Sequence, residues 1–324
     1  MVKRIEQFDI AKAVLIFLVV LGHAIGLVQE NGWTYNSVYV YNFIFTFHMP
    51  AFFIITGILF DDDKWKNMSV KTFAINRIRT IIVPYLFFEL WDSIMQLFVY
   101  KIGINGFLYC MKKMLIVICN AGANWFLVAL FVGEIIYLLI IKYSNKVLGI
   151  IVQIVCLLIP FFLTDNHLCM IIGRSLIAYS MIMLGSELKK FLKSEKSYNW
   201  KYIIISLIIT IVVSLINKRV NVFLCKVNNP ILFILGAVSG TYFILGISGK
   251  MHSRLLSFIG RNTLPILGTH QRLLFLIPRY LPMQGSIIWV FIDVLIVFIM
   301  EIPFILILNQ FLPFLVGKQS NKQS

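Results

Sequence analysis

The stretch FDIAKAVLIFLVVLGHA, residues 8–24, indicates the class of fold. It belongs to an apolar run from Ile10 to about Val28, and a run of roughly 20 apolar residues is long enough to cross a bilayer as a helix. The run lacks a small-residue cleavage site followed by a polar chain, as a secretory signal would have. We therefore interpret it as a membrane span that stays in the protein.

The composition of the whole chain agrees with this interpretation. Of the 324 residues, 60% are hydrophobic and only 13% are charged, whereas soluble domains carry roughly 25% charged residues. This composition excludes a soluble globular, disordered, collagen-like or coiled-coil protein. Because backbone groups must be satisfied internally within lipid, the sequence predicts an all-α polytopic bundle of about ten transmembrane helices.

The apolar runs set the expected spans and the domain organisation. We predict spans at residues 10–28, 40–60, 80–100, 124–142, 147–163, 168–187, 201–217, 230–249, 257–278 and 285–312. Segment 103–119 contains Lys112 and Lys113, so we expect an interfacial or re-entrant piece there. The whole of 1–316 is predicted to form one transmembrane domain, followed by a polar cytoplasmic tail at 317–324.

The distribution of positive charge predicts the orientation. The net charge of +15 comes from 29 Lys and Arg residues, and most of them fall at one side of the expected bundle if the amino terminus is cytoplasmic. Both termini are then cytoplasmic, and the basic charge needs no nucleic-acid partner. Lys218, Arg219 and Lys226 depart from this rule because they fall in an expected outer loop.

Polar residues on the first span are the first candidates for function. Lys12 and His23 are eleven positions apart, which at about 100° per residue places them on one helix face, roughly 16 Å apart along the axis. Asp9 lies on the same stripe. The structural alternative is a snorkelling Lys12 paired with Asp9, together with a hydrogen-bonded structural histidine.

Two further histidines fall at a similar depth. His48 and His270 are each expected in the outer half of a span, so three imidazoles could gather there. Zinc binding is the weaker interpretation because no carboxylate falls at a spacing suited to supporting metal ligands, and we predict no metal site. General-base chemistry is favoured because imidazole titrates near neutrality.

Charged residues elsewhere supply the remaining candidates. Arg77 and Arg79 precede a span and could bind phosphate oxygens, although positive-inside residues look the same. Buried acids need partners inside the membrane. They are Glu89, Asp92, Glu134, Asp293 and Glu301.

Five phrases, in order along the chain, resemble one family. They are FDIAKAVLIFLVVLGHA (8–24), FHMPAFFIITGILF (47–60), NRIRTIIVPYLFF (76–88), NWFLVALF (124–131) and RNTLPILGTHQ (261–271). Together they resemble acyltransferase family 3 of bacterial membrane acyltransferases, closest to the stand-alone members that acetylate sugars. The resemblance covers nearly the whole chain.

This resemblance implies a reaction and assigns roles. Such enzymes move an acetyl or other short acyl group from cytoplasmic acyl-CoA to a hydroxyl of a cell-surface or exported glycan. His23 would be the base or a transient acyl carrier. The catalytic set implied is His23, His48, His270 and Glu134, and the donor-binding set is Lys12, Arg77, Arg79, Tyr85 and Trp125.

The chain departs from the family pattern at three positions. Lys12 stands where many members have arginine, Asn76 holds one position of the usual pair of arginines, and Thr56 replaces a serine. A lysine lacks the guanidinium fork for bidentate phosphate binding.

The implied partners are acyl-CoA as a donor substrate, a glycan or lipid-linked saccharide as acceptor, and the bilayer. No permanently bound cofactor is implied, and a homo-oligomeric state stays open. The main alternative is an exporter or flippase of a polysaccharide or lipid-linked sugar, which would act without acyl transfer. A structural or regulatory partner in an envelope assembly is a third alternative.

Overall fold

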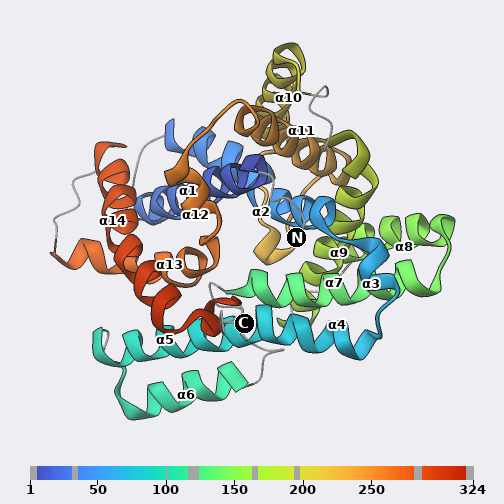
Figure 1. The fold of residues 1–324 in the computed structure, drawn as a ribbon. Helices are drawn as coiled ribbons and strands as arrows, with labels where there is room; N and C mark the ends of the chain where they lie inside the picture. Colours follow the sequence, from blue (N-terminus) through green and yellow to red (C-terminus); the bar gives the residue numbers. More distant parts are fainter. Residues whose placement is uncertain are drawn as a thin grey trace.

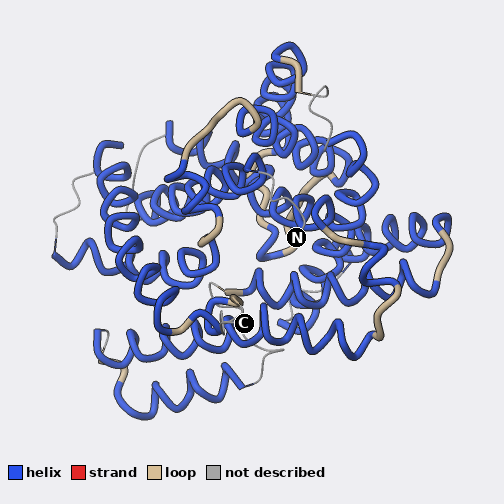
Figure 2. The backbone as a smooth tube through the Cα atoms, in the orientation of Figure 1, coloured by secondary structure: helices blue, strands red, loops and turns tan. Residues whose placement is uncertain are grey.

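The computed structural model describes residues 6–30, 36–99, 101–115, 124–162, 167–192, 198–280 and 287–318. The helices are α1 (Glu6–Glu30), α2 (Asn36–Leu59), α3 (Asp62–Lys66), α4 (Val70–Arg77), α5 (Val83–Val99), α6 (Gly103–Leu115), α7 (Trp125–Tyr143), α8 (Lys146–Leu158), α9 (His167–Leu192), α10 (Trp200–Asn217), α11 (Pro230–Ser248), α12 (Arg254–Gly260), α13 (Thr263–Tyr280) and α14 (Ile287–Phe311). A π-helical turn, η1 (Ile78–Ile82), joins α4 to α5, and short 3-10 turns follow α8 and α14. In the described ranges the backbone forms no strand, only one isolated bridge between Asn221 and Lys226 (Figure 2). The prediction of an all-helical bundle is confirmed.

Eight of these helices are long and apolar enough to cross a membrane, among the residues that the structure describes. They are Glu6–Leu27, Ser37–Leu59, Val70–Val99, Trp125–Tyr143, Leu168–Leu192, Trp200–Asn217, Pro230–Ser248 and Ile288–Phe311. The expected number of ten is therefore not confirmed. The expected span at 147–163 corresponds to α8, which has only 13 residues, and the expected span at 257–278 is divided into α12 and α13.

Helix α2 lies at the centre of the bundle. It packs against α1, α9, α10 and α11, while α1 also contacts α12, α13 and α14 (Figure 1). Helices α6, α8 and α10 lie at the periphery of the view. The outward face of α10 exposes Ile204, Ile208, Ile211 and Leu215. An apolar face of this kind suits contact with lipid.

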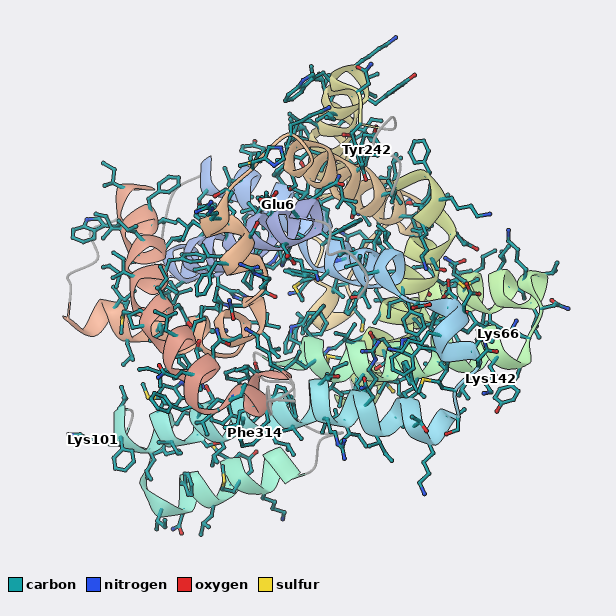
Figure 3. The ribbon with its side chains drawn as sticks, viewed as in Figure 1. Glu6, Lys66, Lys101, Lys142, Tyr242 and Phe314 are labelled. Carbon is teal, nitrogen blue, oxygen red and sulfur yellow. The ribbon has the colours of Figure 1, made fainter. Side chains whose placement is uncertain are left out.

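Contacts between distant segments show which parts of the chain meet at each of the two ends of the bundle. We call the end near the start of α1 the Lys12 end. There, Ser257 donates to Glu6 over 3.2 Å, and Lys142 donates to the carbonyl of Met68 over 2.6 Å. Figure 3 shows Lys142 on the same side of the bundle as Lys66, whose carbonyl it also contacts. At the opposite end, which we call the His23 end, the loop after α10 contacts α2 and α9.

The first and last described parts of the chain lie at the same end of the bundle. Glu6 contacts α12, and Lys318 donates over 2.6 Å to Asn262, which lies between α12 and α13. Both parts therefore lie at the Lys12 end. The expected tail at 317–324 lies outside the described residues beyond Lys318.

Candidate active site

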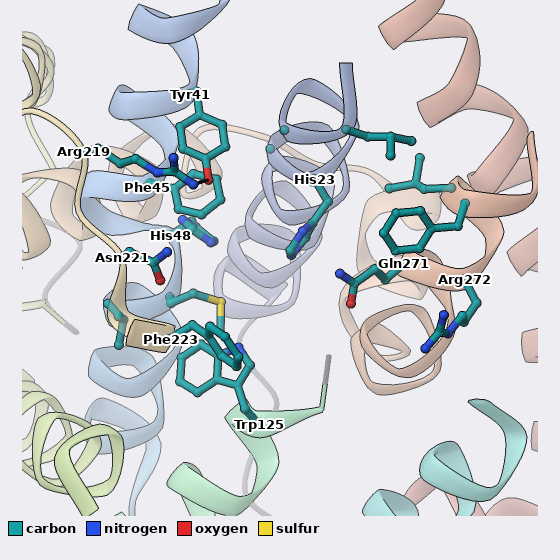
Figure 4. A pocket seen from close by; sticks show the side chains of 17 residues that line it. His23, Tyr41, Phe45, His48, Trp125, Arg219, Asn221, Phe223, Gln271 and Arg272 are labelled. Atoms are coloured by element: carbon teal, nitrogen blue, oxygen red, sulfur yellow. Dashed lines mark hydrogen bonds between the residues drawn. The ribbon is translucent and has the colours of Figure 1, made fainter. Parts of the chain in front are cut away.

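A cavity of about 590 Å³, which we call the histidine cavity, lies at the His23 end (Figure 4). Its walls come from α1, α2, α13, the start of α7 and the loop after α10. The described residues that line it are Gly22, His23, Gly26, Leu27, Tyr41, Phe45, His48, Met49, Trp125, Arg219, Asn221, Val222, Phe223, Gln271, Arg272, Leu274 and Phe275. Two of the predicted histidines thus face one cavity, from different helices.

The third predicted histidine lies against the first. The ring centroids of His23 and His270 are 5.2 Å apart, and the ring of His48 contacts Phe45, whose centroid is 4.7 Å away. The Nδ1 atoms of His48 and His270 lie 2.8 Å from the carbonyl oxygens of Ile44 and Ile266. A carbonyl only accepts, so in these contacts Nδ1 carries the proton and Nε2 is left able to accept one.

Aromatic side chains shape the rest of the histidine cavity. The rings of Tyr41 and Phe45 stack with centroids 3.9 Å apart. Next to the cavity, the buried Arg174 guanidinium lies 4.1 Å from the ring centroid of Phe223 and 5.8 Å from that of Trp125. Its Nε also donates to the carbonyl of Phe223 over 2.5 Å. Arg174 therefore fixes two walls of the cavity, and an arginine inside a predicted span was the signal that could have found it.

A second cavity of about 540 Å³, the Arg77 cavity, lies at the Lys12 end. Its described lining includes Lys12, Lys64, Arg77, Glu134 and Lys189. Nε of Arg77 lies 2.6 Å from Oε2 of Glu134, whose side chain is 4% exposed. Of the predicted catalytic set, Glu134 is thus the one member placed away from the histidines, where it faces Arg77.

A third cavity of about 250 Å³ lies between the other two, and we call it the linking cavity. It shares Lys12 and Thr56 as lining residues with the Arg77 cavity, and it shares Met49 with the histidine cavity. It also includes Arg261, which sequence reasoning did not single out. The three cavities therefore follow one another from the Lys12 end to the histidines, with shared residues between neighbouring cavities.

The remaining predicted donor-binding residues take different positions. Arg79 is exposed on η1 and Tyr85 is buried in α5, and neither lines these three cavities. Trp125 lines the histidine cavity, at the opposite end from Arg77. Of the five predicted donor-binding residues, Lys12 and Arg77 thus line one cavity. Arg79, Tyr85 and Trp125 do not line that cavity.

Several buried acids have identifiable partners. Asp92 binds Arg272, with 2.9 Å between Oδ2 and Nη2, and Asn124 donates to Glu89 over 3.0 Å. Thr269 donates to Glu301. Glu89 and Asp92 therefore bind different partners.

The Arg77–Glu134 pair yields a prediction about stability. We expect Arg77→Ala to lower the free energy of unfolding by about 3 kcal/mol, because it leaves the Glu134 carboxylate buried without its counter-charge. The double variant Arg77→Met, Glu134→Leu should recover most of this loss, since it removes both charges. Thermal unfolding of the purified protein in detergent measures both effects. A single variant as stable as the parent would contradict the prediction.

The chain matches the family model described as an acyltransferase domain, acyltransferase family 3, over residues 5–316. This match covers nearly all of the 324 residues, so the chain belongs to that family. With eight helices able to span a bilayer in its described part, it is a multi-pass membrane acyltransferase. No curated protein and no solved structure matches the chain.

Proposed function

We propose that this acyltransferase transfers an acetyl or other short acyl group from cytoplasmic acyl-CoA to a hydroxyl of a cell-surface or exported glycan. The proposal is supported by the series of three neighbouring cavities, which share Lys12, Thr56 and Met49 as lining residues. Cationic side chains lie at one end of this series and imidazoles at the other. A donor with phosphates and a long thioester arm fits such a path.

The donor would enter from the Lys12 end. Lys12, Arg77 and Arg261 line the Arg77 and linking cavities and would bind phosphate oxygens of CoA there. The pantetheine arm would extend along the linking cavity past Met49. Lys12 and His23 are separated by roughly 16 Å along α1, so the arm carries the thioester across this distance.

The chemical step would take place in the histidine cavity. An imidazole nitrogen of His23 accepts the proton of the acceptor hydroxyl, and the hydroxyl oxygen attacks the thioester carbonyl carbon. The carbon–sulfur bond then breaks, the acyl group stays on the glycan oxygen, and the thiolate of CoA takes the proton from His23. In the alternative course His23 first carries the acyl group itself and then passes it to the hydroxyl.

We further propose that the Lys12 end is cytoplasmic in a bacterial cytoplasmic membrane, with both termini on that side. The contacts of Glu6 and Lys318 with the α12 region support a common side for the two ends. Helices α8 and α13 would add two shorter or more polar passes to the eight candidate spans, which gives the expected ten. The cationic lining of the Arg77 cavity agrees with this orientation.

The experiment that tests the proposed function compares the surface glycan of parent and deletion cells by mass spectrometry. We expect the glycan of the deletion cells to lack an acyl-sized mass, and a plasmid copy of the chain to restore it. An unchanged glycan mass would refute acyl transfer to this acceptor class. Loss of the glycan itself from the surface, with its acyl groups intact inside the cell, would instead indicate export.

A further inference from the structure

The histidine cavity contains two guanidinium groups in different electrostatic surroundings. No carboxylate belongs to the described residues that line this cavity. Arg272 is bound by Asp92 from behind, which balances its charge. Arg219 instead contacts a neutral group, because its Nη2 donates to the hydroxyl of Tyr41 over 3.2 Å and its guanidinium lies 5.1 Å from that ring centroid. The positive charge of Arg219 therefore faces the cavity.

The loop that carries Arg219 is held in a defined shape. Nδ2 of Asn228 donates to the carbonyls of Asn217 and Arg219 over 2.6 and 2.9 Å, and Nδ2 of Asn217 donates to Val227 over 3.2 Å. The bridge between Asn221 and Lys226 closes the loop further along. These bonds fix the backbone on both sides of Arg219, so its side chain enters the cavity from a rigid support.

The positive charges of the same loop depart from the positive-inside rule. Under the orientation proposed above, Lys218, Arg219 and Lys226 lie on the outer side, where positive residues are disfavoured. Topology therefore does not account for a cation at this position. A ligand with negative charge would account for it, since guanidinium pairs strongly with carboxylate and phosphate oxygens.

An apolar platform lies directly beside Arg219. The Tyr41 ring that the guanidinium contacts is stacked on Phe45, and the Phe45 ring contacts His48 (Figure 4). Tyr41 and Phe45 cover one face of each other, and the surface that they leave to the cavity is apolar, which suits the C–H groups of a sugar ring. The cavity thus offers one anion-binding group, one ring-binding surface and the imidazoles in sequence.

We propose that the acyl acceptor is an anionic saccharide, whose carboxylate or phosphate binds Arg219 while the C–H groups of a sugar ring contact Tyr41 and Phe45. The proposal rests on the proposed function, and it adds the charge of the acceptor to it. A carboxylate would belong to a uronic acid unit and a phosphate to a glycosyl phosphate. Arg219 is then a specificity-determining residue at the rim of the site.

The test measures binding of three probes to the purified full-length chain in nanodiscs, without acyl-CoA. The probes are glucose, glucuronic acid and glucose 1-phosphate, and isothermal titration gives their dissociation constants. We expect at least one anionic probe to bind about 10- to 100-fold more tightly than glucose, the range for hydrogen bonds to charged groups. The preferred probe distinguishes a carboxylate from a phosphate.

Variants connect this preference with Arg219. Arg219→Gln should abolish the preference for the anionic probe and leave glucose binding unchanged, and Arg219→Lys should keep part of it. Lys226→Ala is the matched control, because Lys226 is an exposed cation of the same loop that does not line the cavity. Equal affinity for all three probes, or a preference that survives Arg219→Gln, would overturn the proposal. Because these assays involve no acyl transfer, their result is independent of the glycan-mass experiment.

Discussion

The variant His23→Ala is expected to abolish acyl transfer while the amount of protein in the membrane stays the same. His23 lies on the wall of the histidine cavity and is only partly buried. Its replacement by alanine therefore enlarges an existing cavity and removes little packing. General-base catalysis typically contributes about 100- to 10,000-fold to a rate, so we expect a loss of at least about 100-fold.

The measurement follows the transfer of radiolabelled acetyl from acetyl-CoA to glycan in membrane vesicles, with the protein quantified by immunoblot. His252→Ala is the matched control, since the His252 side chain is 88% exposed and lies at the Lys12 end, where it contacts Glu6. This control should retain full activity. Acyl transfer that persists in His23→Ala membranes at the parental rate would exclude the role proposed for this imidazole.

Sequence reasoning was most successful where the information is local. The periodicity of α1 places Lys12 and His23 on one face, and in the structure they line two neighbouring cavities that share Met49. The depths of His48 and His270 follow from their positions within apolar runs. The structure places His48 on the same cavity and His270 against His23.

Pairings between distant segments could not be predicted. Arg77 and Glu134 meet across α4 and α7, and Arg272 meets Asp92 across α13 and α5, and no spacing in the sequence encodes these contacts. The same holds for Arg219, which falls in a loop and reaches the cavity only because α10 and α11 pack on α2. The number of ten spans stays a prediction, because α13 carries polar residues and is not among the eight described helices that are apolar enough to count as spans.

The crossing of α2 and α9, which sets the position of His48, provides the second large expected effect. A Cβ atom on Gly185 would lie 2.1 Å from the carbonyl oxygen of Ile54, and one on Gly57 would lie 1.9 Å from that of Ile182. The two glycines thus let the helix backbones approach each other, as small residues do in membrane bundles. Backbone atoms cannot move aside as a side-chain end can.

We therefore expect Gly185→Ala to lower the free energy of unfolding by about 3 kcal/mol, at the upper end of the cost of overpacking, because one methyl group forces α9 away from α2. Thermal unfolding monitored by size-exclusion chromatography measures the loss.

The matched control is Gly149→Ala, whose added Cβ would lie 3.2 Å from Cε of Met183 and 3.3 Å from Cγ2 of Ile140. Cε ends the flexible Met183 side chain, and both contacts are relieved by a shift of a few tenths of an ångström, so this variant should unfold at nearly the parental temperature. Equal stability of the two variants would show that α2 and α9 do not cross at these glycines. Helix α2 carries Phe45 and His48, so Gly185→Ala should lose acyl transfer together with the packing of α2 on α9. Gly149→Ala should keep acyl transfer.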